Sequence, residues 1–328
     1  IQSIPHLGAA AKQLYVFQRT PSSVDERRNR ETDPDWFKSL QPGWQQDRND
    51  NFTKLLVGVS VEEDLVNDGW TELFKSLGEL MDDNRVRARV EDTVKDKATA
   101  EALKHWYRPW CKRPCFNDDY LPTFNRPNVK LVDTGGKGVD RLTEKGVVVD
   151  GVEYEVDCII FATGFEVSRA TYTRQAAMEV IGRGGETLGN YWSNGMRTYH
   201  GLMSHGFPNL YHMGFTQTGY TPNFTYQLDK QAQHLAKVFA DVQERGIAAL
   251  EPTLQAEEDY LALVLAPTAM TEYLASCTPG YYNAEGSAKS ENDGFLQGHY
   301  PEGGLKFYEM LKEWRARGDY AGLTVRQG

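Results

Sequence analysis

The amino-acid sequence predicts an α/β fold with two structural units, and three observations support this. The chain has 328 residues, more than a single small core usually organises. An apolar helical segment at residues 1–7 leads into a compact apolar run at 13–17, which is typical of one half of a strand–helix–strand unit. A second apolar run, at 157–161, ends in the small residues 162–164, and ligands of open α/β sheets lie beyond such strand ends.

The first half of the chain is expected to combine short strands with helices. Residues 25–50 are polar and indicate an exposed connection, whereas apolar residues at helical spacing run through 53–106. Pro109 and Pro114 flank the next segment and disfavour a helix, so we expect this segment to be extended or turning. Buried or half-buried strands are predicted at 128–133, 146–149, 154–156 and 157–161.

The second half of the chain is expected to be mainly helical. A buried strand is predicted at 209–214, followed by a loop at 215–224 that contains Thr, Gly, Tyr and Pro. Residues 277–304 are rich in glycine and are expected to form loops. Helices are predicted at 226–244, 253–273 and 305–317.

The composition argues against several classes of function. The formal net charge is −10 and no long basic run occurs, so a nucleic-acid partner is not expected. No apolar stretch approaches the roughly 20 residues that a membrane span needs, and no leader-like segment opens the sequence. We therefore expect a cytoplasmic protein without a membrane span. We also expect no metal site, because the histidines that invite one lack metal-site spacing with carboxylates or cysteines. These histidines are His105, His200, His205 and His212.

Several short motifs occur in an order that resembles the Baeyer–Villiger monooxygenases, a family of flavoproteins. The motifs are VFQRTP at 16–21, CKRP at 111–114, FNRPNV at 124–129, DCIIFATGF at 157–165, CTPGYYN at 277–283 and GGL at 303–305. The CTPGYYN motif is more similar to the branch that acts on bulky or cyclic ketones and steroids. The resemblance covers nearly the whole chain.

This resemblance implies an FAD- and NADPH-dependent monooxygenase with two dinucleotide-binding (Rossmann-like) domains. Such an enzyme inserts one oxygen atom of O₂ next to a ketone carbonyl and gives an ester or lactone through a flavin peroxide. Residues 1–34 and 107–160 are expected to form part of the NADP-binding domain, 35–106 a helical insertion, and 161–328 the C-terminal part of the FAD-binding domain. Because the family's glycine loops lie upstream of Ile1, we expect the chain to lack the N-terminal FAD-binding half. That missing part of the same protein is an expected partner, beside the ketone and O₂.

The CKRP motif is expected to supply the catalytic residue, Arg113. A guanidinium stays charged at any relevant pH, so it can stabilise a peroxide anion and then the tetrahedral adduct. The resemblance assigns this role to Arg113. The alternative interpretation is a surface cation that pairs with Asp118 or Asp119.

The end of the run at 13–17 is expected to select the nicotinamide cofactor. An arginine at this position of a dinucleotide fold favours NADP over NAD. Gln18, Arg19 and Thr20 therefore predict NADPH, and the resemblance adds Lys112 as a ligand of its 2′-phosphate. A surface ion pair of Arg19 is the alternative interpretation.

The remaining candidate residues lie on loops and turns. The resemblance assigns backbone approach to a cofactor to Ala162, Thr163 and Gly164, with a plain strand-to-loop turn as the alternative. It assigns the ketone pocket to a loop that contributes Gly219, Tyr220, Thr221 and Phe224, with Thr221 also facing the cofactor; an ordinary surface loop is the alternative. In the family a tryptophan near residue 273 contacts the nicotinamide cofactor, and this sequence has Tyr273 there.

Two other functions remain open from the sequence. A flavin monooxygenase that oxygenates nitrogen or sulfur shares part of the motif set, but its chemistry does not need an arginine over the peroxide. A non-catalytic fragment is the third hypothesis, because the glycine loops are absent from this chain. The absorbance spectrum of bound flavin distinguishes the fragment from both enzymes.

Overall fold

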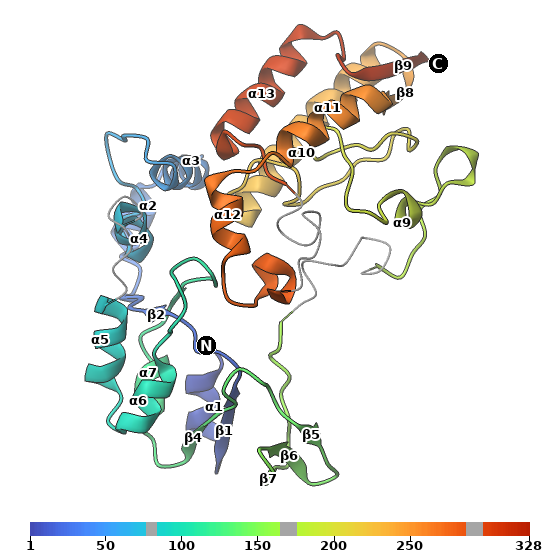
Figure 1. The fold of residues 1–328 in the computed structure, drawn as a ribbon. Helices are drawn as coiled ribbons and strands as arrows, with labels where there is room; N and C mark the ends of the chain where they lie inside the picture. Colours follow the sequence, from blue (N-terminus) through green and yellow to red (C-terminus); the bar gives the residue numbers. More distant parts are fainter. Residues whose placement is uncertain (77–83, 165–175, 287–297) are drawn as a thin grey trace. The chain divides into compact units, whose positions relative to one another are not determined.

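The computed structural model describes residues 1–76, 84–164, 176–286 and 298–328 (Figure 1). The chain divides into two compact units. The first contains Ile1–Pro42 and Val66–Phe165, and the second contains Gly43–Leu65 and Glu166–Gly328. The stretch 35–106, predicted as one insertion, is therefore shared: residues 43–65 group with the second unit and the rest with the first.

A pair of parallel strands anchors the first unit. Helix α1 (Ile4–Ala10) precedes strand β1 (Leu14–Gln18), and β1 pairs with β4 (Val129–Asp133) so that Gln18 lies opposite Asp133. The helix packs closely because Gly8 has no side chain: a Cβ there would lie 2.8 Å from Cγ2 of Thr123. The helix-to-strand start and the strand at 128–133 are confirmed.

Short helices surround a second parallel pair in the same unit. Strand β2 (Val24–Asp25) pairs with β3 (Cys115–Phe116), so the chain beyond β1 runs beside the chain beyond the CKRP motif. Apolar side chains from this region form one core that includes Val24, Leu103 and Leu121. The helices are α2 (Pro34–Ser39), α4 (Gly69–Ser76), α5 (Asn84–Thr93), α6 (Lys97–Leu103) and α7 (Tyr120–Thr123).

The predicted buried strand at 157–161 is wrong. Strands β5 (Arg141–Leu142), β6 (Gly146–Val149) and β7 (Val152–Glu155) form an antiparallel sheet, as the strand predictions at 146–149 and 154–156 indicate. Beyond β7 the chain is irregular, and the side chains of Ile160 and Phe161 are 60% and 69% exposed. Within the described ranges no strand lies beside this segment to complete its backbone hydrogen bonds, so its apolar side chains find no core.

The second unit is mainly helical, and its described residues include the antiparallel strand pair of β8 (Ile247–Pro252) with β9 (Leu323–Gln327). The long helix α10 (Phe224–Glu244) and α13 (Gly303–Arg317) confirm the predictions at 226–244 and 305–317. Apolar side chains of α10, β8 and α13 meet in a core around Leu235, Leu250 and Phe307. The other helices are α3 (Trp44–Leu56), α9 (Leu188–Tyr191), α11 (Leu254–Val264) and α12 (Ala269–Ala275), with 3₁₀ turns η1 (Arg183–Gly185) and η2 (Tyr281–Gly286).

Two predictions for this unit need correction. The segment 209–214 is not a strand, because its backbone donors go to two separate segments: Asn209 N–H binds the carbonyl of Leu250, and His212 N–H that of Leu202. The single helix predicted at 253–273 is two helices, and the side chain of Thr268 caps the second one by accepting a hydrogen bond from the backbone of Thr271. None of the helices that the structure describes is long and apolar enough to cross a membrane.

Candidate functional site

Gln18 is the last residue of strand β1, and its buried side chain fixes the end of the strand. Its side chain is 7% exposed, and its Nε2 donates to the carbonyl of Ala102 at 2.8 Å. Its own carbonyl accepts from both the backbone N–H and the hydroxyl of Thr134, at 2.9 Å each. The side-chain amide of Gln18 thus joins β1 to α6, and its backbone carbonyl joins β1 to the residue after β4, while Arg19 directly after Gln18 is exposed.

Tyr107 joins the segment after Arg19 and Thr20 to the CKRP motif. Its hydroxyl accepts a hydrogen bond from Ser23 N–H at 3.1 Å. The Nζ of Lys112 lies 5.5 Å from the centre of the same ring, within the range of a cation–π contact. The structure therefore brings Lys112, through the ring of Tyr107, close to the chain just beyond Thr20.

Arg113 is exposed and its guanidinium carbon lies 5.9 Å from the ring centre of Trp70. In the described part of the chain Arg113 makes no ion pair, so the alternative of a pair with Asp118 or Asp119 is not observed. The carboxylate of Asp118 instead accepts backbone N–H groups.

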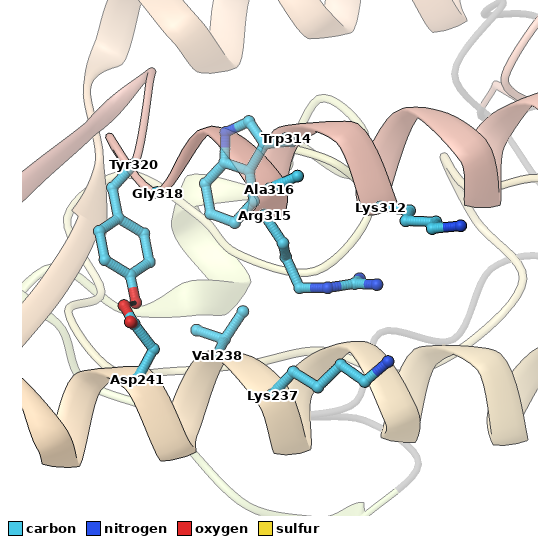
Figure 2. Close-up of a pocket in the computed structure, with 9 residues that line it drawn as sticks. All are labelled: Lys237, Val238, Asp241, Lys312, Trp314, Arg315, Ala316, Gly318 and Tyr320. Atoms are coloured by element: carbon cyan, nitrogen blue, oxygen red, sulfur yellow. Dashed lines mark hydrogen bonds between the residues drawn. The ribbon is translucent and has the colours of Figure 1, made fainter.

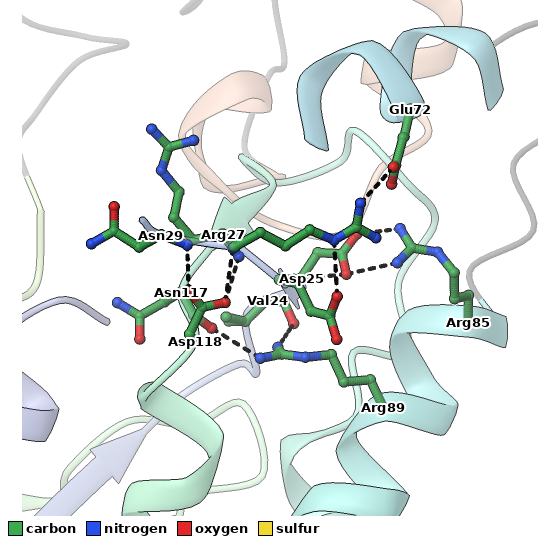
Figure 3. A network of polar contacts seen from close by, with 11 residues as sticks. Val24, Asp25, Arg27, Asn29, Glu72, Arg85, Arg89, Asn117 and Asp118 are labelled. Atoms are coloured by element: carbon green, nitrogen blue, oxygen red, sulfur yellow. Dashed lines mark hydrogen bonds and ion pairs between the residues drawn. The ribbon is translucent and has the colours of Figure 1, made fainter. Parts of the chain in front are cut away.

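Asp118 holds the chain after β2 in place (Figure 3). Its carboxylate accepts backbone N–H groups of Arg27, Arg28 and Asn29 at 2.8, 3.1 and 2.9 Å. Burial alone would raise the pKa of Asp118, but these three donors and the charge of Arg89 outweigh burial and hold the pKa below its ordinary value. The carboxylate thus stays ionised and keeps the two segments joined.

Two arginines of α5 complete this network. Arg85 binds both carboxylate oxygens of Asp25, and Arg89 donates to the carbonyls of Val24 and Asn117 at 2.8 and 3.1 Å. Arg89 therefore bridges β2 and the chain after β3. Sequence reasoning missed these residues. The sequence does show several arginines close together on one helix, α5, but this pattern is also typical of a solvent-exposed helix face.

Residues 162–164 form an exposed, irregular segment of the first unit. Gly164 has a φ of +89°, in the left-handed region that favours glycine, and a Cβ added to it would meet nothing within 4 Å. Ala162 and Thr163 are exposed as well. The last residue of the DCIIFATGF motif, Phe165, lies outside the described residues.

Two buried glutamines of α10 hold the start of the 215–224 loop in the second unit. Both side chains are fully buried. Gln231 exchanges two hydrogen bonds with the backbone of Gly214, at 2.8 and 3.0 Å. The Nε2 of Gln227 donates to the carbonyl of Gly214 at 2.6 Å and to the hydroxyl of Thr218 at 2.5 Å. Buried side chains thus hold the start of the loop in a defined conformation, so it is not an unrestrained surface connection.

Gln217 fixes the middle of the same loop. Its side-chain oxygen accepts from the hydroxyl of Thr198 at 2.5 Å, and its Nε2 donates to the carbonyl of Met196 at 2.6 Å. Its backbone carbonyl accepts from the hydroxyl of Tyr260 at 2.6 Å. Sequence reasoning did not single out these glutamines, because nothing local marks a glutamine as buried.

The predicted pocket residues lie at different depths in this loop. Gly219 packs against the start of α13, where its missing side chain is required: a Cβ would lie 2.6 Å from the Cα of Gly304. Thr221 is fully buried and its hydroxyl accepts from Asn223 N–H at 3.3 Å. Phe224 is 38% exposed and stacks on Phe215 with ring centres 4.0 Å apart.

Tyr220 and Tyr273 complete the set. The ring centre of Tyr220 lies 5.5 Å from that of His299. Tyr273 belongs to α12, and its carbonyl accepts from the hydroxyl of Ser276 at 2.7 Å.

Asn283, in the CTPGYYN motif, is 2% exposed and binds backbone groups of four residues. These are Cys277, Thr278, Gly280 and Gly286.

The candidate residues therefore form one group in each unit. Gln18, Arg19, Thr20, Lys112 and Arg113 belong to the first unit, with Lys112 joined through Tyr107 to the chain after Thr20, whereas the predicted pocket loop and Tyr273 belong to the second unit. Within the described ranges there is no cluster of three or more His, Cys, Asp or Glu residues that could hold a metal ion.

Comparisons with known proteins agree on one family. No protein-family model matches the chain. The Baeyer-Villiger monooxygenase ATR8 of Stachybotrys chlorohalonatus is 44% identical, over 99% of this chain and 56% of the relative. The structure of a polycyclic ketone monooxygenase from Thermothelomyces thermophila is 34% identical with a TM-score of 0.87, over 99% of this chain and 58% of that chain. An oxidized steroid monooxygenase bound to NADP is 26% identical with a TM-score of 0.77, over 100% of this chain and 65% of that chain.

The chain thus spans a little more than half the length of the curated relative and less than two thirds of either structure. The likeness runs through both units, because nearly the whole chain is covered in each comparison. It confirms the α/β fold predicted from the sequence. The chain is thus similar over nearly its whole length to Baeyer–Villiger monooxygenases in sequence, and to a polycyclic ketone and a steroid monooxygenase in fold.

Proposed function

We propose that this protein is an FAD- and NADPH-dependent Baeyer–Villiger monooxygenase that converts a ketone into an ester or lactone. The observation that carries the proposal is the exposure of Arg113 and the lack of a carboxylate beside it among the described residues. It is exposed, follows Lys112 in the CKRP motif, and has no carboxylate partner among the described residues. A guanidinium in that state can stabilise negative charge that develops on the transferred oxygen and on the ketone oxygen.

NADPH would be held through its 2′-phosphate by residues of the first unit. Arg19 stands exposed at the end of β1, and Lys112 lies beside Tyr107, which binds the backbone of the chain after Thr20. Both side chains are cations at neutral pH, as a phosphate ligand requires. Gln18 would act differently from the sequence prediction, by supporting the strand end from inside.

The domain assignment belongs to the same proposal. Residues 1–34 and 107–160 would form part of the NADP-binding domain, and 161–328 part of the FAD-binding domain, with Ala162–Gly164 as the passage between them. The segment 35–106 would be the helical insertion, of which 43–65 groups with the second unit. FAD, when bound, supplies the activation of O₂ with NADPH as the reductant.

The substrate class is proposed to be bulky or cyclic ketones. The loop with Gly219, Tyr220, Thr221 and Phe224 would shape the pocket, with Phe224 as its exposed apolar contact. Thr221 would affect the pocket indirectly, by fixing the conformation of the loop, since its own side chain is fully buried. Tyr273 is proposed to contact the nicotinamide cofactor. The names of the two structural neighbours, a polycyclic ketone and a steroid monooxygenase, support this substrate class.

The test is to supply the purified full-length protein with FAD, NADPH and a panel of cyclic and polycyclic ketones. We expect a bound-flavin absorbance spectrum, ketone-dependent NADPH consumption and a product heavier by one oxygen atom, with the label from ¹⁸O₂. Oxygenation of amines or sulfides without any ketone product would establish the alternative flavin monooxygenase. Absence of bound flavin and of turnover would favour a non-catalytic fragment. The cytoplasmic location remains a prediction.

A further inference from the structure

A basic pocket lies between α10 and α13 in the second unit, and its lining contains none of the residues proposed for oxygenation (Figure 2). Its volume is about 300 Å³. Three cationic side chains border it: Lys237 from α10, and Lys312 and Arg315 from α13. Figure 2 shows their charged ends toward the same end of the pocket. This local positive charge contrasts with the formal net charge of the chain, which is −10.

These three cations have no carboxylate partner in the part of the chain that the structure describes. Among the residues that the structure describes, neither lysine forms an ion pair, and nor does Arg315. The carboxylate in the described lining is that of Asp241, and it is engaged elsewhere. Its Oδ2 accepts from the hydroxyl of Tyr320 at 2.5 Å and pairs with Arg245 at 3.2 Å. The positive charge at the other end of the pocket is therefore not neutralised from within this lining.

Arg315 is a partly buried cation of this pocket, and no opposite charge compensates it among the described residues. Its side chain is half-buried, and its guanidinium contacts Nδ1 of His234. Burial and the nearby charge of Arg315 lower the pKa of His234 to about 3, so the imidazole is neutral and Nδ1 can accept from the guanidinium. A partly desolvated charge without an opposite charge is unfavourable. An anion in the pocket would relieve that cost.

We propose that this pocket binds a small anion that carries a phosphate group. A doubly charged phosphate matches three cations that border one pocket better than a single carboxylate does, and the planar guanidinium of Arg315 can bind two of its oxygens. Val238 and Trp314 supply apolar lining. The volume suits a phosphate monoester with a small organic group as well as inorganic phosphate. This site is independent of the proposed oxygenation chemistry.

The experiment measures phosphate binding by ³¹P line broadening in a low-salt buffer without other multivalent anions. Titrations use the purified protein with inorganic phosphate and, separately, with phenyl phosphate. We expect saturable binding that weakens with added NaCl. Tighter binding of phenyl phosphate would identify an organic monoester as the ligand, and equal binding would identify the free anion. A phosphate response that does not saturate would overturn the proposal.

Variants then locate the site. We expect Lys237→Gln and Lys312→Gln each to weaken binding about two- to fivefold, as exposed charge pairs do. Their combination should weaken it roughly by the product. The control Lys306→Gln removes a lysine of α13 that pairs with Glu309 at 2.8 Å and does not line the pocket. It should leave phosphate binding unchanged.

The proposed NADPH site also binds phosphate, so the two sites must be separated. Arg19→Ala and Lys112→Ala should leave phosphate binding at the α10–α13 pocket unchanged. If binding is lost in these two variants and retained in Lys237→Gln/Lys312→Gln, the pocket is not a phosphate site. The three cations then serve only their helices, where Lys312 and Arg315 favour the C-terminal end of α13.

Discussion

Gly219 and Gly304 are in direct backbone contact: a Cβ on Gly219 would lie 2.6 Å from the Cα of Gly304. The contact joins the proposed pocket loop to the first turn of α13. Both glycines belong to segments that the sequence singled out for separate reasons, the loop at 215–224 and the GGL motif. Their packing explains why position 219 needs a residue without a side chain.

The first prediction concerns this contact. Gly219→Ala should lower the free energy of unfolding by about 1–3 kcal/mol, because backbone atoms must move to admit the methyl group. Gly304→Ala should be milder. Its Cβ would lie 3.0 Å from the carbonyl oxygen of Tyr220, and alanine gains helix propensity of about 1 kcal/mol over glycine. Urea unfolding of both variants measures the difference, and equal losses would contradict the close-contact explanation.

The second prediction concerns the buried glutamines. Gln231→Leu leaves the N–H of Gly214 without its acceptor, which should cost about 1–3 kcal/mol. Gly214 keeps a partner for its carbonyl in Gln227. The matched control is Gln233→Leu on the same helix, because Gln233 is exposed and its side chain donates to Asp229 at 2.8 Å. Chemical unfolding should show a loss for Gln231→Leu alone; comparable losses would mean that the loop does not depend on that clamp.

The third prediction concerns Arg113. Arg113→Ala should retain bound flavin and NADPH oxidation but lose ketone oxygenation by about 10²- to 10³-fold, as removal of one preorganised donor does. Product yield per NADPH consumed is the measurement. The control Arg30→Ala removes an exposed arginine of the same unit and should leave the yield unchanged. A normal lactone yield from Arg113→Ala would refute the proposed role.

The fourth prediction concerns cofactor choice. Arg19→Ala should raise the KM for NADPH about tenfold and change the KM for NADH little, because only NADPH carries the 2′-phosphate. Steady-state kinetics with both cofactors measures this ratio. A similar loss with both cofactors would indicate that Arg19 supports the fold of the strand end instead.

The fifth prediction concerns acid stability. Burial lowers the pKa of both His200 and His234 to about 3, from the ordinary value of 6.5. The unfolded chain takes up protons below pH 6.5 while the folded chain does not, so stability falls as the pH decreases from 6.5 toward 3. Each histidine contributes up to about 1.4 kcal/mol per pH unit in that window.

Two variants test this linkage. His200→Phe should flatten the decline between pH 7 and pH 5 in urea unfolding, since the aromatic ring can keep its contact with Trp314. The exposed His6→Gln serves as the control and should leave the slope unchanged. An unchanged slope in His200→Phe would show that His200 is not responsible.

The sequence predicts elements whose signal is local. The helices α10 and α13 have clear helical spacing, and β1 and β4 are compact apolar runs. The segment 157–161 has the same apolar signal as β1, yet it is exposed, because a strand also needs a neighbour that sequence periodicity cannot supply. The pair β8–β9 was not predicted, since it joins segments that lie far apart in the chain, at 247–252 and 323–327.

The candidate site likewise contains some residues that the sequence predicts and others that only the folded structure reveals. Motif order placed Arg113 and Lys112 in a turning segment, and the structure brings that segment beside the chain after β1. Gln227, Gln231 and Asn283 were missed as structural residues, because their role depends on backbone groups that only the folded loop brings near. A glutamine on an amphipathic helix is ordinarily expected to face solvent.

The side-chain amide of Gln18 bears on protein engineering. Because its Nε2 is committed to the carbonyl of Ala102, replacing Gln18 to change cofactor preference would first disturb the packing of β1 against α6. A library designed to exchange NADPH for NADH should therefore leave position 18 constant and vary positions 19, 20 and 112, whose side chains are exposed or half-buried where that of Gln18 is buried.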